Sequence, residues 1–401
     1  MAKEKTYDEM SAEEQKQYRI TRYNELTDYD AAIAQLVKEI ELARSGALPL
    51  WSTGFPTLDA LLDGGFLAGN LVLLGAISSL GKTTFALQIA ENIALSGKDV
   101  LVFSLEMSKS DLLAKSISRN TYRIVERAKK ASPRLDYYED GDRLAMGDVK
   151  LGRIGDGQAD AVNRWTRRDL FDAALAETQK LKDHLRILRD NDMSVEKLES
   201  IVAAHEEATG NKPFVILDYL QILKHDETLR GDKRLLTDDD VNRLKDIAVR
   251  VNIPIMVISS FNRNNYFEPA SMGSFKESGT IEYSSDVLIA MQYSGMQYEK
   301  HKGNDGKTYY ESQADHNNRV RDLLDRCDAI GAAGGALDVD VVLLKNRGNA
   351  KGTVYFEFCP KYNVFEEKTD QLEAATRSPR KSNKSLPVVS SDKPTIGDKL
   401  I

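Results

Sequence analysis

Cysteine is almost missing from this sequence of 401 residues, which contains only Cys327 and Cys359. Two cysteines cannot form a four-cysteine zinc ribbon, and because neither has a near partner we expect reduced thiols, as in a cytoplasmic protein. The five histidines show no spacing typical of metal ligands. The sequence therefore predicts neither a disulfide framework nor a zinc site.

Long hydrophobic runs are also missing. No uninterrupted apolar stretch approaches the roughly 20 residues that a membrane helix needs. The first residues, MAKEKTYDEMSAEEQKQYR, are polar throughout and unlike a secretory signal. Hydrophobic residues make up 41% of the chain and charged residues 29%, which is typical of globular proteins. We therefore expect a cytoplasmic protein without a membrane partner.

An excess of positive charge is the third missing feature. The chain has 55 Lys and Arg against 62 Asp and Glu, a net charge of −7. This balance excludes a protein covered in basic surface, and a solvated surface is its simplest explanation. A local basic channel for nucleic acid remains open, because such binding depends on where the charge lies.

The pattern of apolar residues divides the chain into three parts. It predicts a helical arm over residues 1–49, an α/β domain over residues 50–366 and, in a stretch rich in Ser, Lys, Arg and Pro, a disordered tail over residues 367–401. Within the domain, residues 124–170 show no clear period and residues 296–335 resemble an insertion. We assign no function to either segment.

The arm is expected to contain two helices. Ser11 and Glu14 have the spacing of a capping box, and a second helix begins near Asp28 or Asp30 and stops near Gly46. The second helix has four apolar residues on one face, which need a packing partner in the domain or in a neighbouring subunit: Ile33, Leu36, Val37 and Ile40.

Short apolar runs in the domain predict a mostly parallel central sheet, because buried parallel strands are apolar on both faces. The runs are LVLL (71–74), VLVFS (100–104), FVIL (214–217), IPIMVIS (253–259) and VLIAM (287–291). Helical stretches, including Thr83 to Leu95 and Ser194 to Thr209, separate several of them. Near the end, residues 339–347 and 353–358 predict a β-hairpin.

The stretch GAISSLGKTTFALQIA (75–90) resembles a phosphate-binding loop, whose pattern is G-x-x-x-x-G-K-[ST]. Ala76, not Gly75, occupies the first glycine position, but the loop lies between a predicted strand and a predicted helix, as such loops do. This order directs backbone N–H groups and the positive end of the helix at a phosphate. The residues expected to bind nucleotide are Ala76, Ser78, Ser79, Leu80, Gly81, Lys82, Thr83 and Thr84.

Two acidic residues follow other predicted strands. Asp218 comes directly after FVIL, where a carboxylate can hold Mg²⁺ together with the Thr83 hydroxyl, and Lys82 is expected to reach the terminal phosphates. Glu106 follows VLVFS and is a candidate for orienting the attacking water. A turn residue at Asp218 and a surface carboxylate at Glu106 are the plain structural alternatives.

Three motifs in this order, GKTTFALQIAEN, VFSLEMS and ILDYLQIL, resemble the C-terminal ATPase domain of the DnaB-family replicative helicases. The resemblance runs from about Thr53 to Phe365 and includes alanine at the first loop position. It implies a RecA-like P-loop fold, ATP and Mg²⁺ as cofactors, and a ring, expected to be hexameric, around single-stranded DNA. A helicase loader and a primase are partners that the family suggests.

The resemblance also implies roles for later segments. ISSFNRNN (258–265) resembles the family's motif that follows a core strand and ends in Asn-Arg. FKESGTIEYSSD (275–286) resembles the loop that lines the central channel and touches the backbone of single-stranded DNA. LLKNRGNAKGTVYFEF resembles the hairpin whose cations enter the ATP site of the next subunit. The resulting DNA-binding candidates are Arg263, Lys276, Glu277 and Gly279, and the candidates for catalysis in trans are Lys345 and Arg347. A solvated hairpin is the alternative for these last two.

Departures from the family pattern keep alternatives open. Ser260 stands where the family usually has a γ-phosphate-sensing glutamine, a role that Asn262 could take instead, and Lys276 stands where many relatives have arginine. The arm is shorter than the family's primase-binding domain, which suggests a phage, plasmid or other mobile-element protein.

The sequence thus predicts an ATP-dependent 5′–3′ DNA helicase. The alternatives are a RecA- or KaiC-like ATPase in recombination or regulation, and a non-catalytic DNA-binding subunit.

Overall fold

The computed structural model describes residues 10–26, 28–46, 48–131, 143–155, 166–190, 192–218, 220, 233–275, 283–302 and 307–368. The chain divides into two compact units, Met1–Leu50 and Trp51–Ile401. The tail beyond residue 368 lies outside the described residues. Among the described helices, none combines the length and apolar character required to cross a membrane.

The first unit contains the two expected helices, α1 (Ala12–Leu26) and α2 (Tyr29–Arg44). The capping box of α1 is confirmed, since the Ser11 N–H donates to the Glu14 carboxylate (2.6 Å) and the Glu14 N–H donates to the Ser11 hydroxyl (3.3 Å). Asp28 caps α2 by accepting a hydrogen bond from the Ala31 N–H. The four apolar residues of α2 are exposed.

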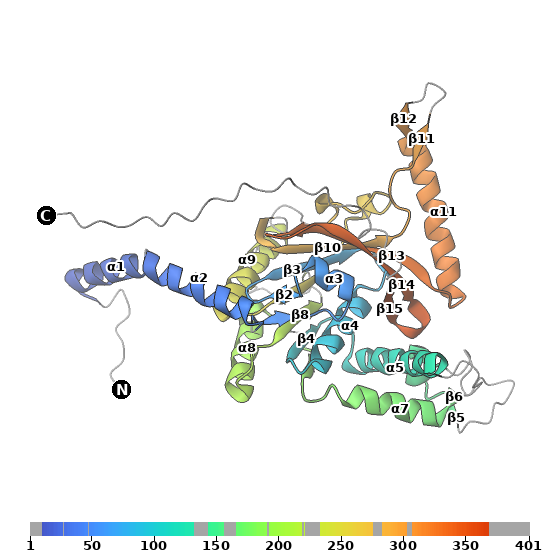
Figure 1. The fold of residues 1–401 in the computed structure, drawn as a ribbon, viewed down its shortest axis with the longest axis horizontal. Helices are drawn as coiled ribbons and strands as arrows, with labels where there is room; N and C mark the ends of the chain where they lie inside the picture. Colours follow the sequence, from blue (N-terminus) through green and yellow to red (C-terminus); the bar gives the residue numbers. More distant parts are fainter. Residues whose placement is uncertain are drawn as a thin grey trace, which may run out of the picture. The chain divides into compact units, whose positions relative to one another are not determined.

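The second unit is built on a nine-stranded sheet with the order β15-β14-β13-β10-β3-β9-β8-β4-β7 (Figure 1). The six strands from β10 to β7 are parallel, and β13, β14 and β15 are antiparallel to their neighbours. The strands are β3 (Leu71–Ala76), β4 (Val100–Ser104), β7 (Leu185–Leu188), β8 (Phe214–Asp218), β9 (Ile255–Ser260), β10 (Val287–Tyr293), β13 (Leu337–Asn346), β14 (Gly352–Cys359) and β15 (Val364–Glu367).

Helices cover both faces of this sheet, with α4 on one face and α8 and α9 on the other. The described helices of this unit are α3 (Pro56–Leu61), α4 (Lys82–Leu95), α5 (Lys109–Ala131), α6 (Met146–Lys150), α7 (Arg168–Gln179), α8 (Val195–Thr209), α9 (Lys233–Val251) and α11 (Gln313–Ala332). Alternate residues of each strand face opposite cores. Val72 and Leu74 pack in the core that contains α4, whereas Leu71 and Leu73 pack in the core that contains α8 and α9.

The remaining elements are short. They are the strands β1 (Leu50–Trp51), β2 (Phe66–Leu67), β5 (Ile154–Gly155), β6 (Thr166–Arg167), β11 (Lys300–Lys302) and β12 (Thr308–Tyr310), and the 3-10 helices η4 (Arg263–Asn265), η5 (Met272–Ser274) and η6 (Pro360–Tyr362). Both cysteines are free thiols, as expected.

The predicted fold class is confirmed: the five apolar runs are the central parallel strands, and the C-terminal hairpin is β13–β14. The edge strand β7 was not predicted, because its four residues are only half-buried and lack a strong apolar signal. The structured chain also extends slightly into the expected tail. The Glu367 carboxylate accepts hydrogen bonds from the N–H groups of Thr57 and Leu58 at the start of α3.

Candidate functional site

The phosphate-binding loop connects the end of β3 to the start of α4 at the carboxyl edge of the sheet. Gly81 is the N-cap of α4 and has φ 89°, in the left-handed region that glycine adopts without strain. A Cβ at Gly81 would lie 2.8 Å from the ring of Phe358, so the position is also crowded from behind. Glycine at this position therefore satisfies both the backbone conformation and the packing.

Gly75, which lies one residue before the first glycine position of the motif, is required for packing. A Cβ on this residue would lie 2.2 Å from the Phe275 ring and 2.8 Å from the Phe261 ring. Ala76, which takes the motif's first position, is fully buried, and its carbonyl accepts a hydrogen bond from the Lys82 ammonium (3.1 Å). The loop therefore keeps its shape with alanine at the first position, and Gly75 is fixed by the two aromatic rings.

Lys82 lies folded over its own loop. Its ammonium donates to the carbonyls of Ala76 and Ile77, at 3.1 and 2.9 Å. A cation held at the centre of a loop that begins a helix is positioned to exchange these carbonyl oxygens for phosphate oxygens.

Thr83 and Asp218 are joined directly: the threonine hydroxyl donates to the aspartate carboxylate at 2.7 Å. Burial raises the pKa of the Asp218 carboxyl to about 6; the Thr83 hydrogen bond opposes this rise, and the negative charge of Glu106 adds to it. A hydroxyl and a carboxylate side by side are hard oxygen ligands, the kind that Mg²⁺ prefers. These two residues therefore fit a magnesium ion.

A pocket of about 470 Å³ opens between the loop and the ends of β8, β9 and β4. Residues from all of these elements line it: Ser78, Ser79, Gly81, Lys82, Thr83, Thr84, Glu106, Met107, Lys115, Asp218, Ile258 and Ser260. The pocket is thus lined by six of the eight predicted loop residues and by both predicted carboxylates. Ala76 and Leu80 are fully buried and do not line it.

Lys115 is a pocket residue that the sequence did not reveal. It lies on α5, and its ammonium donates to the Thr84 hydroxyl (3.0 Å) and the Asn363 side-chain oxygen (2.8 Å). Burial lowers its pKa to about 8, and the nearby charge of Arg119 contributes. A lysine on a long polar helix is ordinarily solvated, so only the packing of α5 against the loop identifies this second cation.

A buried ion pair fixes α5 to α4 behind the pocket. Arg119 and Glu91, 0% and 1% exposed, form an ion pair, and Arg119 also donates to the carbonyls of Asn363 (2.7 Å) and Thr84 (3.3 Å). Ser116 donates to the same glutamate. The guanidinium of Arg119 on α5 therefore contacts both α4 and Asn363, the residue that follows η6.

We expect Arg119→Met to lower the free energy of unfolding by about 3–5 kcal/mol, because it leaves Glu91 charged and buried without its partner. Chemical denaturation measures the loss. The double variant Arg119→Met/Glu91→Leu should recover part of it. Arg168→Met is the matched control: its pair with Asp172 is exposed, and such pairs contribute about 1 kcal/mol or less. A double variant no more stable than the single would contradict this explanation.

Comparison with known proteins identifies the family of the domain that contains this pocket. The sequence model of the family "DnaB-like helicase C terminal domain" matches residues 51–367. The chain belongs to this family. It is 24% identical over 342 residues to the replicative DNA helicase DnaB of Helicobacter pylori (strain ATCC 700392 / 26695), covering 82% of this chain and 62% of that protein. It is 22% identical to DnaB of Geobacillus stearothermophilus, covering 83% and 60%.

Solved structures show the same fold. One structure of an isolated ATPase domain superposes with a TM-score of 0.60 at 20% identity, covering 84% of this chain and 97% of the other. A DnaB-like replicative helicase studied with primase gives 0.59 at 20% identity, covering 84% and 66%. The chain therefore has the RecA-like fold of these ATPase domains, and it spans less than two thirds of the curated relatives named above.

In this DnaB-like domain, Lys345 and Arg347 lie far from the pocket of their own chain. Asn346 pairs with Val287, the first residue of β10, and Val287 pairs with Val72 near the start of β3. The loop follows the other end of β3, roughly 16 Å away at about 3.3 Å per residue. The two cations therefore lie at the amino edge of the parallel strands, opposite the carboxyl edge that carries the pocket.

Contacts at this edge hold the two cations. Arg347 pairs with Asp286 at 3.1 Å, and its side chain is 60% exposed. Asp286 also accepts from Lys245 (2.6 Å) and from the Leu71 N–H (2.8 Å). The Lys345 ammonium donates to the Tyr283 carbonyl at 3.3 Å.

The structure describes only some of the other residues predicted to contact DNA or nucleotide. Arg263 is exposed on η4, just beyond Ser260, which lines the pocket. Asn262 is exposed and does not line it. Lys276, Glu277 and Gly279 lie outside the described residues, so their role stays a prediction.

Proposed function

We propose that this protein is an ATP-driven DNA helicase that forms a ring, expected to be hexameric, on single-stranded DNA and separates a duplex in the 5′–3′ direction. The observation that supports it best is the Thr83–Asp218 contact beside Glu106 and Lys82 in one pocket. Family membership supports the helicase function over a recombination or regulatory ATPase.

In the proposed mechanism, Lys82 and the N–H groups of the loop bind the terminal phosphates of ATP. Thr83 and Asp218 hold Mg²⁺, which supplies charge neutralisation on the transferring phosphoryl group. Glu106 accepts a hydrogen bond from the attacking water, orients it toward the γ-phosphorus and, as general base, accepts its proton. Lys115 lies on the other wall of the same pocket and adds a second positive charge there.

Assembly would complete the site. A cation at the amino edge of one subunit's strands can serve only a different subunit's pocket, which fits the proposed role of Lys345 and Arg347 in trans. The exposed apolar face of α2 fits the family's linker helix, which docks on the next subunit. A loader and a primase are further proposed partners.

Strand separation on forked DNA tests this function, with the 5′ and 3′ tails blocked in turn and ATP present. We expect unwinding that requires the 5′ tail and is lost in Lys82→Ala, because the phosphates lose their central cation. DNA-stimulated ATP hydrolysis without strand separation, under conditions that include loader candidates, would contradict the helicase function and favour a RecA- or KaiC-like ATPase.

A further inference from the structure

Residues 294–336, here called the insertion, connect β10 to β13 in the sequence, and these two strands are neighbours in the sheet. They comprise β11, β12 and α11 (Figure 1). The insertion leaves and returns at the same edge of the sheet, because Tyr293, the last residue of β10, pairs with Val339 near the start of β13. Since β10 is parallel to β3, this is the carboxyl edge that carries the nucleotide pocket.

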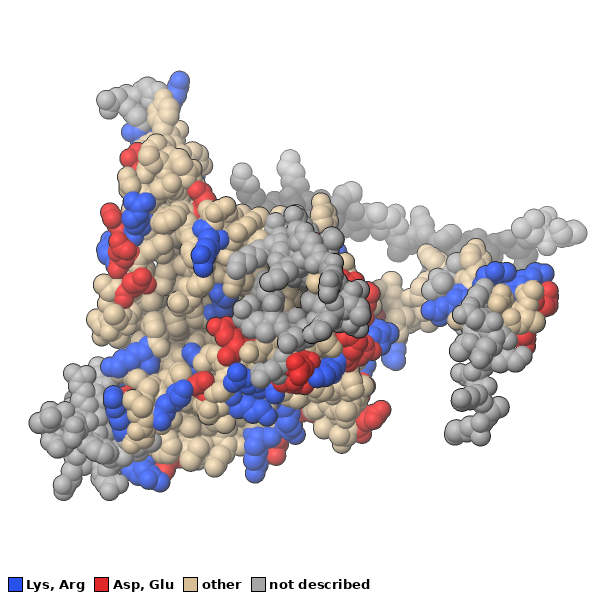
Figure 2. Space-filling view, turned by 180° about the vertical axis from the view of Figure 1, so that it is seen from behind, with Lys and Arg blue, Asp and Glu red and all other residues tan. Residues whose placement is uncertain are grey.

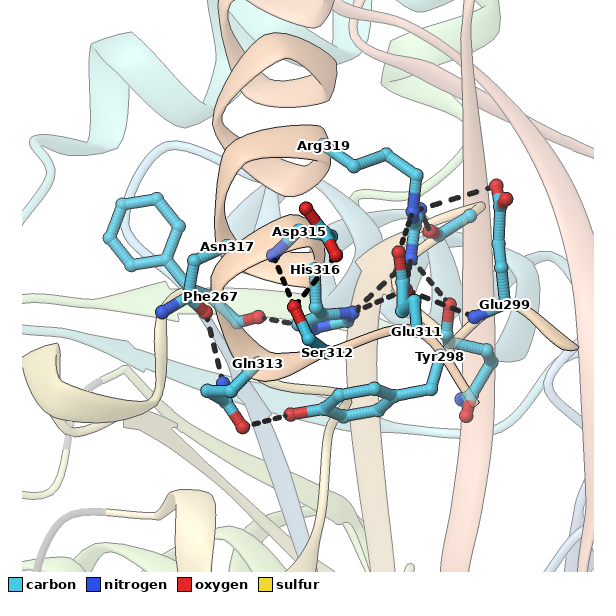
Figure 3. Close-up of polar contacts among 12 residues, drawn as sticks. Phe267, Tyr298, Glu299, Glu311, Ser312, Gln313, Asp315, His316, Asn317 and Arg319 are labelled. Atoms are coloured by element: carbon cyan, nitrogen blue, oxygen red, sulfur yellow. Dashed lines mark hydrogen bonds and ion pairs between the residues drawn. The ribbon is translucent and has the colours of Figure 1, made fainter. Parts of the chain in front are cut away.

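The base of the insertion is held by a polar network (Figure 3). Glu311 accepts from Arg319 at 3.1 and 2.6 Å and contacts the His316 ring at 2.9 Å. His316 is fully buried, and the Tyr298 ring stacks on it at 3.8 Å between centroids. Farther along α11, Val320 and Cys327 are buried in the domain. The base is therefore a fixed part of the domain.

Residues of this network form hydrogen bonds with the segment 261–275, which follows β9. His316 contacts the Phe267 carbonyl at 2.9 Å, and the Tyr298 hydroxyl donates to Glu268 at 3.0 Å. Tyr266 of the same segment shares a hydrogen bond of 3.0 Å with Ser78 of the phosphate-binding loop. One short segment thus touches the nucleotide loop and the base of the insertion, and it ends at Phe275, directly before Lys276 in the sequence.

The tip of the insertion is a two-stranded ribbon with cations and aromatic rings. Lys300 pairs with Tyr310 and His301 with Tyr309, so one face of the ribbon carries Tyr310 together with Lys300 and Lys302, and the opposite face carries Tyr309 and His301. The tyrosines are 51% and 63% exposed at positions 309 and 310, and the Lys300 ammonium lies 5.3 Å from the Tyr310 ring. In Figure 2, Lys and Arg side chains lie beside the end of the insertion.

The charges of the ribbon are separated along its length. The acidic residues Glu299 and Glu311 lie at the base, where Arg319 neutralises them at 3.5 and 2.6 Å. Lys300 and Lys302 lie farther out and are exposed. An isolated two-stranded ribbon is only marginally stable, so a network that fixes it while more than half of each tyrosine stays exposed indicates a binding surface.

We propose that the β11–β12 ribbon binds single-stranded DNA, with bases stacking on Tyr310 and Tyr309 and with Lys300 and Lys302 contacting phosphates. Aromatic rings next to cations are the recognition pattern for unpaired strands, because every base has a stacking face. The inference rests on the proposed helicase function and extends it: DNA contacts a second surface, outside the loop at Lys276. Base stacking requires unpaired bases, so duplex DNA binds the ribbon through phosphates alone.

Binding of the full-length chain to a fluorescent oligothymidine, measured by anisotropy, tests the proposal. We expect Tyr309→Ser/Tyr310→Ser to weaken binding about fivefold or more, because each stacked base contributes about 1–3 kcal/mol. Lys300→Gln/Lys302→Gln should lower the slope of log affinity against log salt by about 0.7 for each phosphate that the variant no longer neutralises.

Matched controls come from the same domain. Tyr355→Ser changes a tyrosine on β14 that is 38% exposed. Lys361→Gln changes a lysine that also lies 5.3 Å from a tyrosine ring, but that ring, Tyr362, is 6% exposed and offers no face to a base. Both controls should bind like the wild type.

The outcomes separate the two proposals. A wild type that binds no single-stranded DNA contradicts the helicase function itself. Ribbon variants that bind as tightly as the controls overturn only the ribbon proposal, as does an equal loss of affinity for duplex DNA in the tyrosine variant.

Photocrosslinking of the wild type to iodouridine-substituted DNA avoids any effect of mutation on folding. Crosslinks at Tyr309 or Tyr310 support the proposal, and crosslinks confined to other segments overturn it.

Discussion

Arg347→Ala is expected to lower the turnover of ATP by about 10³–10⁵-fold while leaving nucleotide binding nearly intact. A cation supplied by a neighbouring subunit stabilises the charge that develops on the transferring phosphoryl group, and its loss affects the reaction far more than binding. Steady-state hydrolysis and binding of a fluorescent ATP analogue measure the two effects separately.

The structure makes this substitution a clean test. Asp286, the partner of Arg347 within the chain, keeps its contacts with Lys245 and the Leu71 N–H when the arginine is removed. No buried charge is therefore left without a partner at this site, and the fold should persist. Lys351→Ala, which removes an exposed cation from the same hairpin, is the matched control and should keep its turnover.

Mixing subunits distinguishes action in trans from action within one chain. Lys82→Ala and Arg347→Ala are each expected to be inactive alone. In a mixed assembly, an interface that combines the intact pocket of an Arg347→Ala subunit with the intact hairpin of a Lys82→Ala subunit is complete. Activity should therefore reappear on mixing. Equal loss of binding and turnover in Arg347→Ala, or no recovery on mixing, would contradict the assignment.

Glu106→Gln is the second substitution with a large expected effect, a fall in turnover of about 10²–10⁴-fold, typical of the loss of a general base. The residue lies just beyond β4 and lines the pocket next to Asp218. Glutamine keeps the size of the side chain but cannot accept a proton from the attacking water. ATP should still bind, because the loop and the Thr83–Asp218 pair are unchanged.

Single-turnover hydrolysis with saturating ATP and Mg²⁺ measures this effect. Glu206→Gln removes a carboxylate of α8 that is 40% exposed, outside the residues that line the pocket, and should be neutral. Asp218→Asn should differ from Glu106→Gln by losing the Mg²⁺ dependence of nucleotide binding. Turnover of Glu106→Gln within a factor of a few of the wild type would rule out its proposed role.

The apolar runs of the sequence were sufficient to predict the central sheet. A buried parallel strand is apolar on both faces, so runs such as FVIL at 214–217 identify strands without knowledge of their neighbours. The strand β7 was missed because its four residues are half-buried. The sheet order, with β8 between β9 and β4, came only from the structure.

The sequence by itself determined the loop and its two carboxylates. Lys82 and Thr83 belong to one contiguous motif, and Asp218 and Glu106 follow parallel strands, whose carboxyl ends meet at one edge of the sheet. The local sequence was therefore sufficient to predict that these four side chains meet in one pocket, and their chemical roles stay predictions.

Only the tertiary structure decided which distant residues join that chemistry. Lys115 enters the pocket because Arg119 and Glu91 fix α5 against α4, and Arg347 lies at the opposite edge because β13 is antiparallel to β10. The insertion is fixed because His316 contacts the Phe267 carbonyl in the segment that follows β9 while Glu311 contacts the other nitrogen of the His316 ring. These contacts join elements that are far apart in the chain, and no local pattern of residues specifies such pairings.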